Sequence, residues 1–230
     1  MPESNYNQIE LILASKSPRR AELLRDAGLM FSQRTPLFDD PAQPVDHPEP
    51  VAHAMDLAKQ KALSLADEMQ VGGVASPVLL IAADTICVGV DGALIGQPRD
   101  KAHAREMIRS FAAATHDVVT GVALMVVDSQ RSGGLSQIGN NEVEQLAVFS
   151  DVVPVTFGKL GTDELERYLV SDQWQGKAGG YNLFDRQEAG WPISLPEDSD
   201  PTTVVGLPMR ILMKQLARLG IDANCAKDSM

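Results

Sequence analysis

Cysteine is scarce in this sequence of 230 residues, which contains only Cys87 and Cys225, far apart in the chain. A disulfide framework or a thiolate metal site needs paired, closely spaced cysteines, so the sequence indicates neither. The sequence has only four histidines, and their spacing does not match that of metal ligands.

Long apolar runs are also missing. The first ten residues are polar and lack the apolar run of a signal peptide. No apolar segment elsewhere approaches the length that a transmembrane helix needs. We therefore expect a soluble, cytoplasmic protein that has no membrane partner.

Positively charged residues are few: the sequence contains 20 Lys and Arg but 31 Asp and Glu. The formal net charge is therefore −11, and the isoelectric point is near 4.7. Such a chain repels nucleic acid and anionic membranes. We therefore expect no nucleic-acid partner, and a local cluster of cations is better explained by a compact anionic small molecule.

Strand-like and helix-like segments alternate along the chain, with no internal repeat. The expected strands are 11–14, 78–83, 118–127 and 146–157, with a hairpin closed around 91–92 and an exposed hairpin tip over 128–144. The expected helices are 18–27, 51–69, 101–113, 162–170 and 208–219. This alternation predicts an α/β protein in which helices flank the sheet. The length suits one large domain or two small lobes.

The start of the first helix carries charges of the wrong sign for an ordinary helix. Ser17 is a good N-cap and Pro18 suits the first helical position. A helix N-terminus has partial positive charge, yet it receives Lys16, Arg19 and Arg20. A polyphosphate that docks on the helix end would explain these cations; three solvated cations on a loop are the alternative.

Two further charged residues stand out among apolar neighbours. Asp84 follows an apolar run, where a carboxylate is destabilised unless it is paired or bound to metal. It is either a catalytic acid at a strand end or the cap of the following turn. Lys61 shares a helical stripe with leucines at positions 57 and 65, so it either snorkels to the surface or lines a cleft.

Lys177 lies in the glycine-rich segment Gln175-Gly-Lys-Ala-Gly-Gly-Tyr181. Such a backbone can approach a phosphate closely, although the segment does not match a P-loop. His116 enters a strand alone, which favours a hydrogen-bonded structural histidine over a metal ligand. No nucleophile elbow or Ser-His-Asp pattern is present.

Taken in order, these segments resemble the motifs of the Maf family of nucleoside triphosphate pyrophosphatases. Ser15-Lys-Ser-Pro-Arg-Arg-Ala-Glu-Leu-Leu24 is similar to the family's SxSPRRxELL. The other similar blocks are Ala58-Lys-Gln-Lys-Ala62, Ala83-Asp-Thr85, His116-Asp-Val-Val-Thr-Gly-Val122, Lys177-Ala-Gly-Gly-Tyr181 and Val204-Val-Gly-Leu-Pro208. Six blocks in the right order and spacing make this resemblance specific.

The resemblance implies a two-lobed mixed sheet flanked by helices, similar to inosine triphosphatases, with the active-site cleft between the lobes. We expect one such domain over residues 1–221 and a flexible tail over 222–230. It also implies hydrolysis of a nucleoside triphosphate between the α- and β-phosphates, with Mg²⁺ or Mn²⁺ as cofactor. Members are commonly homodimers, are regarded as housekeeping enzymes and have been linked to arrest of cell division.

By position, the resemblance gives Asp84 the role of general base or metal-held water activator. Lys61 and Lys177 would neutralise charge that develops during the reaction. The implied substrate-binding residues are Ser15, Arg19, Arg20, Thr85 and Gln97. The implied metal ligands are Asp84 and Asp40.

Two of these positions depart from the family pattern. Asp40 stands where a glutamate is usual, one methylene shorter. Gln97 replaces the usual lysine and so removes a positive charge from the expected phosphate site. Loss of such a contact can lower a rate on the order of a hundredfold. A nucleotide-binding regulator of cell division, weakly active or inactive, is therefore the alternative function.

The base preference is indicated only in part. Arg19, Thr85 and Lys177 resemble the family members that favour dTTP and UTP over 7-methyl-GTP. Phe184 replaces a glutamine that could read a base edge, and a phenyl ring can only stack. We therefore predict dTTP or UTP, or modified pyrimidine nucleotides, as substrates.

Overall fold

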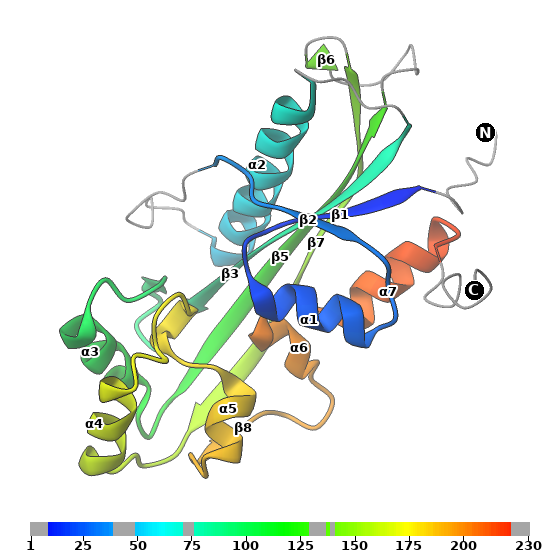
Figure 1. Cartoon of the computed structure of the whole chain (residues 1–230). Coiled ribbons are helices and arrows are strands. Elements are labelled where there is room, and N and C mark those ends of the chain that lie inside the picture. The colour runs from blue at the N-terminus through cyan, green and yellow to red at the C-terminus, as the bar shows by residue number, and fades with distance from the viewer. Residues whose placement is uncertain (1–8, 39–48, 71–75, 129–136, 139–140, 222–230) are drawn as a thin grey trace.

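The computed structural model describes residues 9–38, 49–70, 76–128, 137–138 and 141–221 (Figure 1). The strands are β1 (Glu10–Ala14), β2 (Ser32–Arg34), β3 (Val78–Val88), β4 (Leu94–Ile95), β5 (Thr115–Asp128), β6 (Gln137–Ile138), β7 (Asn141–Phe157) and β8 (Ile193–Ser194). The helices are α1 (Pro18–Asp26), α2 (Pro50–Gln70), α3 (Lys101–Phe111), α4 (Thr162–Val170), α5 (Leu183–Glu188), α6 (Pro201–Val205), α7 (Met209–Arg218) and the 3₁₀ turn η1 (Ala178–Gly180).

Within these described ranges the strands form one mixed, eight-stranded sheet in the order β2-β1-β3-β5-β7-β6, with β4 beside β3 and β8 beside β7. Strand β1 runs parallel to β2 and β3, and the remaining pairs are antiparallel. Helix α2 covers one face of the sheet, and α1 and α7 lie on the other (Figure 1). The predicted α/β class with flanking helices is confirmed.

Alternation along β3 divides the central core between the two faces of the sheet. Leu79, Ile81 and Ala83 pack with the apolar residues of α1 and α7. Leu80 and Ala82 face the other way and pack with α2. Because side chains alternate along a strand, the residues that follow Ala83 continue to point to opposite faces.

A separate core lies at the other end of β5 and β7, where α3, α4 and α5 gather (Figure 1). Phe111 of α3 and Tyr168 of α4 are buried there, together with Trp191. The two cores give the two lobes that the family resemblance implies.

Local signals in the sequence set several helix ends, among them the predicted N-cap at Ser17. The Ser17 hydroxyl accepts a hydrogen bond from the Arg20 backbone N–H, 3.4 Å away, and so caps α1. Asp100 caps α3 in the same way. Gly28 follows the end of α1 with φ of 74°, a conformation that glycine adopts without steric cost.

Gly121 of β5 permits a close crossing of α2 over the sheet. A Cβ at this position would lie 2.4 Å from the backbone of Ala54 in α2. Only glycine fits this approach, which places α2 against β3 and β5. The crossing fixes the height of Lys61 above the sheet, because Lys61 lies two turns further along the same helix.

One predicted boundary is wrong. The strand expected to end at position 83 continues to Val88, since β5 pairs with β3 along its whole length. The helix expected over 162–170 is confirmed as α4, with Gly161 as its N-cap residue.

The chain between 178 and 205 contains η1, α5, β8 and α6, none of which we expected from the sequence. These elements have 3, 6, 2 and 5 residues, too few to show a hydrophobic period. The expected metal ligand Asp40, most of the expected hairpin tip at 128–144 and the tail at 222–230 lie outside the described residues. No described helix is both long and apolar enough to cross a membrane.

Candidate active site

Asp84 lies in the middle of β3, just beyond the point where β1 ends. The last residue of β1, Ala14, pairs with Ala82. The Asp84 side chain is only 9% exposed, and its Oδ1 lies 2.5 Å from Nζ of Lys61, whose side chain is 11% exposed. Lys61 therefore points into the protein rather than to solvent, and Asp84 pairs with a cation rather than capping a turn.

Arg20 lies beside the same part of β3 and contacts four acceptors. Its Nη1 donates to the Ala83 carbonyl at 2.8 Å and to the Ser15 hydroxyl at 3.2 Å. Its Nη2 donates to Thr85 Oγ1 at 3.0 Å, and its Nε donates to the Gly206 carbonyl at 2.9 Å. The predicted site residues Ser15, Arg20 and Thr85 thus form one hydrogen-bonded group.

A row of hydroxyl groups leads from this group into the protein. Thr120 Oγ1 lies 2.9 Å from Thr85 Oγ1 and donates to the Thr203 carbonyl at 2.7 Å. The Thr203 hydroxyl in turn donates to Asp151 at 2.5 Å. Both Thr120 and Thr203 are fully buried, so their hydrogen bonds offset the cost of desolvating their hydroxyl groups.

Arg19 points away from Arg20 and toward the glycine-rich segment. Its Nη2 donates to the Gly176 carbonyl at 3.2 Å. The next residue, Lys177, is 12% exposed in its side chain, donates to the Gln173 carbonyl and lies 3.8 Å from Asp185 Oδ2. Burial lowers the pKa of both cations, and for Lys177 the nearby Arg19 charge lowers the pKa further.

Gln97 lies on the neighbouring chain segment. The carbonyl of Gly96 accepts a 3.0 Å hydrogen bond from the N–H of Gly179, which ties this segment to the loop that carries Lys177. The Gln97 side chain is exposed. The structure therefore places Gln97 near the Lys177 loop, where the family pattern has a further cation.

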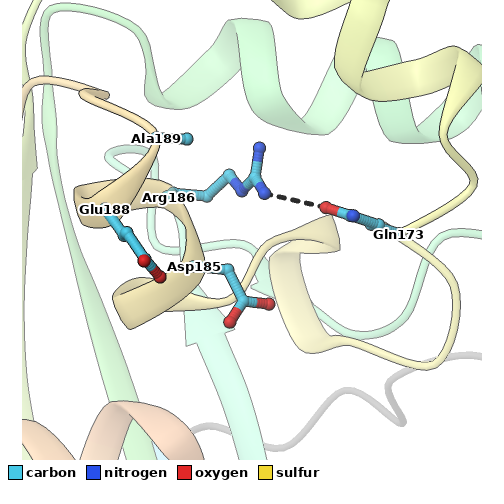
Figure 2. A pocket seen from close by; sticks show the side chains of 5 residues that line it. All are labelled: Gln173, Asp185, Arg186, Glu188 and Ala189. Carbon is cyan, nitrogen blue, oxygen red and sulfur yellow. Dashed lines mark hydrogen bonds between the residues drawn. The ribbon is translucent and has the colours of Figure 1, made fainter.

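An open, polar pocket of about 490 Å³ borders this loop, lined by Gln173, Asp185, Arg186, Glu188 and Ala189. Figure 2 shows Arg186 reaching from α5 to the Gln173 side chain, with a 2.8 Å hydrogen bond between them. Two of the lining residues, Gln173 and Asp185, also contact Lys177. Two residues of the pocket wall are thus in contact with Lys177.

The predicted site residues therefore form three groups. Lys61 contacts Asp84, the Ser15 and Thr85 hydroxyl groups contact Arg20, and Arg19 lies with Lys177. Adjacent residues join the groups in the chain: Asp84 precedes Thr85, and Arg19 precedes Arg20. The two arginines, which the sequence suggested as a pair, bind different partners.

Asp185 and Arg186 were not predicted as site residues from the sequence. Arg186 lies 4.4 Å above the Tyr168 ring and 5.4 Å above the Trp191 ring, which holds its guanidinium in place. Helix α5 that carries them is only six residues long, so its sequence shows no periodicity. The one local signal is the N-cap Asn182, whose side chain accepts from the Phe184 N–H.

His116 has the structural role that its position predicts. It stacks on Phe111 with ring centroids 3.8 Å apart, and its Nε2 lies 2.9 Å from the Tyr181 hydroxyl. Burial lowers the pKa of His116 to about 4, so the ring is neutral near pH 7. A neutral histidine held in this way supports the fold of the second lobe.

Of the two predicted metal ligands, Asp84 lies in the described ranges and Asp40 does not. No group of three or more His, Cys, Asp or Glu residues that could hold a metal occurs there. Mg²⁺ usually binds through one or two carboxylates and substrate phosphates, and keeps several waters. Asp84 alone fits that requirement, if phosphate oxygens supply further ligands.

Comparisons with known proteins agree on one family. A family model described as Maf-like protein matches residues 10–219. A dTTP/UTP pyrophosphatase from Symbiobacterium thermophilum is 32% identical over 92% of this chain and 94% of its own length. One from Lacticaseibacillus casei is 34% identical, over 90% of this chain and 97% of its own length.

A human relative is longer. The protein named probable bifunctional dTTP/UTP pyrophosphatase/methyltransferase protein is 32% identical over 91% of this chain. The match spans 32% of the human protein's length. The resemblance therefore concerns one part of that protein.

Proposed function

We propose that this chain, which belongs to the Maf family, is a nucleoside triphosphate pyrophosphatase that cleaves the bond between the α- and β-phosphates. The observation that carries this proposal is the enclosed Lys61–Asp84 pair, which supplies a carboxylate beside a cation just past the end of β1. In α/β proteins this edge of parallel strands commonly binds ligands. The bacterial relatives' names favour dTTP and UTP as substrates.

Hydrolysis of the anhydride requires an activated water molecule. The water oxygen forms a new bond to phosphorus while the bond to the bridging oxygen breaks. Asp84 accepts the proton that the water loses, and nucleoside monophosphate and pyrophosphate leave. A positioned carboxylate base typically accelerates such a step by about 10²–10⁴-fold.

The second requirement is compensation of negative charge on the triphosphate. Arg19 and Lys177 lie together on the loop side of the site, where their mutual repulsion favours an added anion. Ser15, three residues before α1 begins, offers a hydroxyl, and the helix end adds backbone N–H groups. We propose that these groups bind the phosphates, with Gln97 at the edge.

We propose Mg²⁺ or Mn²⁺ as cofactor, held by Asp84 and, as the family resemblance implies, by Asp40. When bound, the ion would polarise a phosphoryl oxygen and offset negative charge. Both ions prefer the oxygen ligands that carboxylates and phosphates provide. Removal of divalent ions with EDTA should stop turnover, and added Mg²⁺ or Mn²⁺ should restore it.

The direct test measures pyrophosphate release from dTTP, UTP and 7-methyl-GTP. We expect release from the pyrimidine nucleotides and at least a hundredfold loss in Asp84→Asn, consistent with the contribution of a general base. Asp67→Asn, an exposed carboxylate on α2, is the matched control and should keep full activity. Normal release by Asp84→Asn, or a clear preference for 7-methyl-GTP, would contradict the proposal.

The same samples test the alternative of a nucleotide-binding regulator of cell division. A regulator would be stabilised against heat by nucleotide without releasing pyrophosphate. The enclosed carboxylate favours the enzyme, because hydrolysis needs a base beside the phosphates, whereas a pure binding protein gains nothing from a carboxylate there.

We further propose a housekeeping role in the cytoplasm, in which the enzyme removes nucleotides that should not enter nucleic acid. The family resemblance also supports a homodimer and a single two-lobed domain over residues 1–221. Light scattering on the purified full chain should give twice the monomer mass of 24.8 kDa.

A further inference from the structure

We infer that Arg20 is a positioning residue for Asp84, an inference that rests on the proposed function. Its guanidinium binds the residues on both sides of Asp84: the Ala83 carbonyl at 2.8 Å and the Thr85 hydroxyl at 3.0 Å. This assignment differs from the sequence-based expectation, in which Arg20 and Thr85 both bind the substrate.

At this point of the sheet β3 still pairs with β5 on one side but has no strand neighbour on the other. Strand β1 ends at Ala14, opposite Ala82, so β3 loses its parallel neighbour just before Asp84. Arg20 contacts β3 there, since α1 follows directly after β1. Beyond the end of β1, the Arg20 guanidinium thus supplies the hydrogen bonds on that side of β3. It binds Ala83, just before Asp84, and Thr85, just after it.

Arg20 is itself held from two other segments. Its Nε donates to the Gly206 carbonyl at 2.9 Å, and Nη1 donates to Ser15 Oγ at 3.2 Å. Gly206 has φ of 128°, and a Cβ there would lie 3.1 Å from Arg20 Nε. The positive φ favours glycine at this position of the Val204–Pro208 block, and a side chain there would crowd Arg20.

The hydroxyl row fixes the direction in which Thr85 points. A threonine hydroxyl donates one hydrogen, and Thr120 uses its hydrogen on the Thr203 carbonyl. Thr85 must therefore donate to Thr120 across their 2.9 Å contact, which leaves its lone pairs for Arg20. Four of the sequence blocks thus meet in one network whose effect is to hold the backbone around Asp84.

The test separates positioning from phosphate binding. Lysine at position 20 keeps the positive charge but cannot bridge Ala83 and Thr85. We expect Arg20→Lys to lower kcat on the order of a hundredfold, the scale of a misplaced catalytic group, with KM for dTTP changed less than about threefold. Thr85→Val should lower kcat in the same direction, and Thr85→Ser should restore most of it.

Binding of pyrophosphate, measured by calorimetry, supplies a second readout. The dissociation constant should stay within about twofold in Arg20→Lys and rise in Arg19→Lys, because of the two arginines Arg19 alone is assigned to the phosphates. Arg25→Lys, an exposed arginine on the same helix, is the control and should change nothing. Unchanged kcat with weaker pyrophosphate binding in Arg20→Lys would overturn the inference.

A crystal structure of Arg20→Lys keeps the inference testable even if the wild-type chain releases no pyrophosphate, which would contradict the proposed function alone. The Lys61–Asp84 pair should then be displaced from its wild-type position, and an unmoved pair would refute the positioning role. Thermal melting checks that each variant is folded. If Arg20→Lys does not fold, Thr85→Val carries the same measurements.

Discussion

The Nζ of Lys61 lies 2.5 Å from Oδ1 of Asp84, and this enclosed ion pair joins α2 to β3. Removing one partner of a buried pair leaves an uncompensated charge, which costs on the order of 3 kcal/mol. We therefore expect Lys61→Met to lower the free energy of unfolding by about this amount and to abolish turnover. Urea denaturation and pyrophosphate release measure the two effects.

The double variant Lys61→Met/Asp84→Leu separates stability from catalysis. Because it replaces both charges with apolar groups, it should recover most of the stability and none of the activity. A double variant as unstable as Lys61→Met would show that the charge of Asp84 is not the source of the destabilisation.

Gln97 offers a gain-of-function prediction. Its segment is tied to the Lys177 loop through the Gly96–Gly179 hydrogen bond, and its side chain is exposed. A lysine there adds a cation near the proposed phosphate site, so we expect Gln97→Lys to raise kcat/KM by about tenfold to a hundredfold. Gln97→Met, of similar length but neutral, should not. Equal rates for the wild type and Gln97→Lys would mean that no charge is missing at this position.

Asp185 is predicted to compete with the substrate. Its carboxylate lies 3.8 Å from Lys177 and interacts electrostatically with Arg19, so it partly neutralises the cations that the triphosphate needs. Asp185→Asn should lower KM for dTTP several-fold and strengthen product inhibition by pyrophosphate. Glu188→Gln, on the rim of the same pocket, is the matched control. A raised KM in Asp185→Asn would instead indicate that the carboxylate orients Lys177.

How much the sequence predicts depends on how local the signal is. The cap at Ser17 and the helices expected over 18–27 and 101–113 are short-range features, and each is confirmed. The α/β class follows from alternating segments. The motif blocks pointed to Asp84 and Lys61 before any contact between them was visible.

The partners of the site residues could not be predicted in the same way. Arg19 and Arg20 are adjacent in the chain, yet successive residues of a helix point in different directions. Arg19 binds the Gly176 carbonyl, whereas Arg20 binds the Ala83 and Gly206 carbonyls. Contacts over such distances in sequence depend on the packing of α1 against α6 and β3. Asp185 was missed because α5 is too short to leave a periodic pattern.

Gly121 provides a test of the helix–sheet approach. A methyl group at this position would lie 2.4 Å from the Ala54 backbone, so α2 must move outward. We expect Gly121→Ala to destabilise the protein by about 1–3 kcal/mol or more, as overpacking does, and to reduce turnover because α2 carries Lys61. Gly161→Ala is the control, since a Cβ there meets nothing within 4 Å and should leave stability and activity intact. Wild-type stability in Gly121→Ala would show that the crossing tolerates a wider spacing.

His116 makes stability depend on pH. Burial lowers its pKa to about 4 in the folded protein, while the unfolded chain keeps a value near 6.5, so between these values the unfolded state binds more protons. The stability that neutral His116 contributes is complete above pH 6.5 and is lost as the pH falls toward 4, by about 1.4 kcal/mol per pH unit and about 3 kcal/mol in total.

His116→Gln removes this titration, although it also loses the stacking on Phe111. Urea denaturation of both proteins from pH 7.5 to 4 isolates the effect, because the carboxylates they share cancel in the difference. The advantage of the wild type over His116→Gln should shrink steadily below pH 6.5, and a constant difference would mean that the ring does not take up its proton on unfolding.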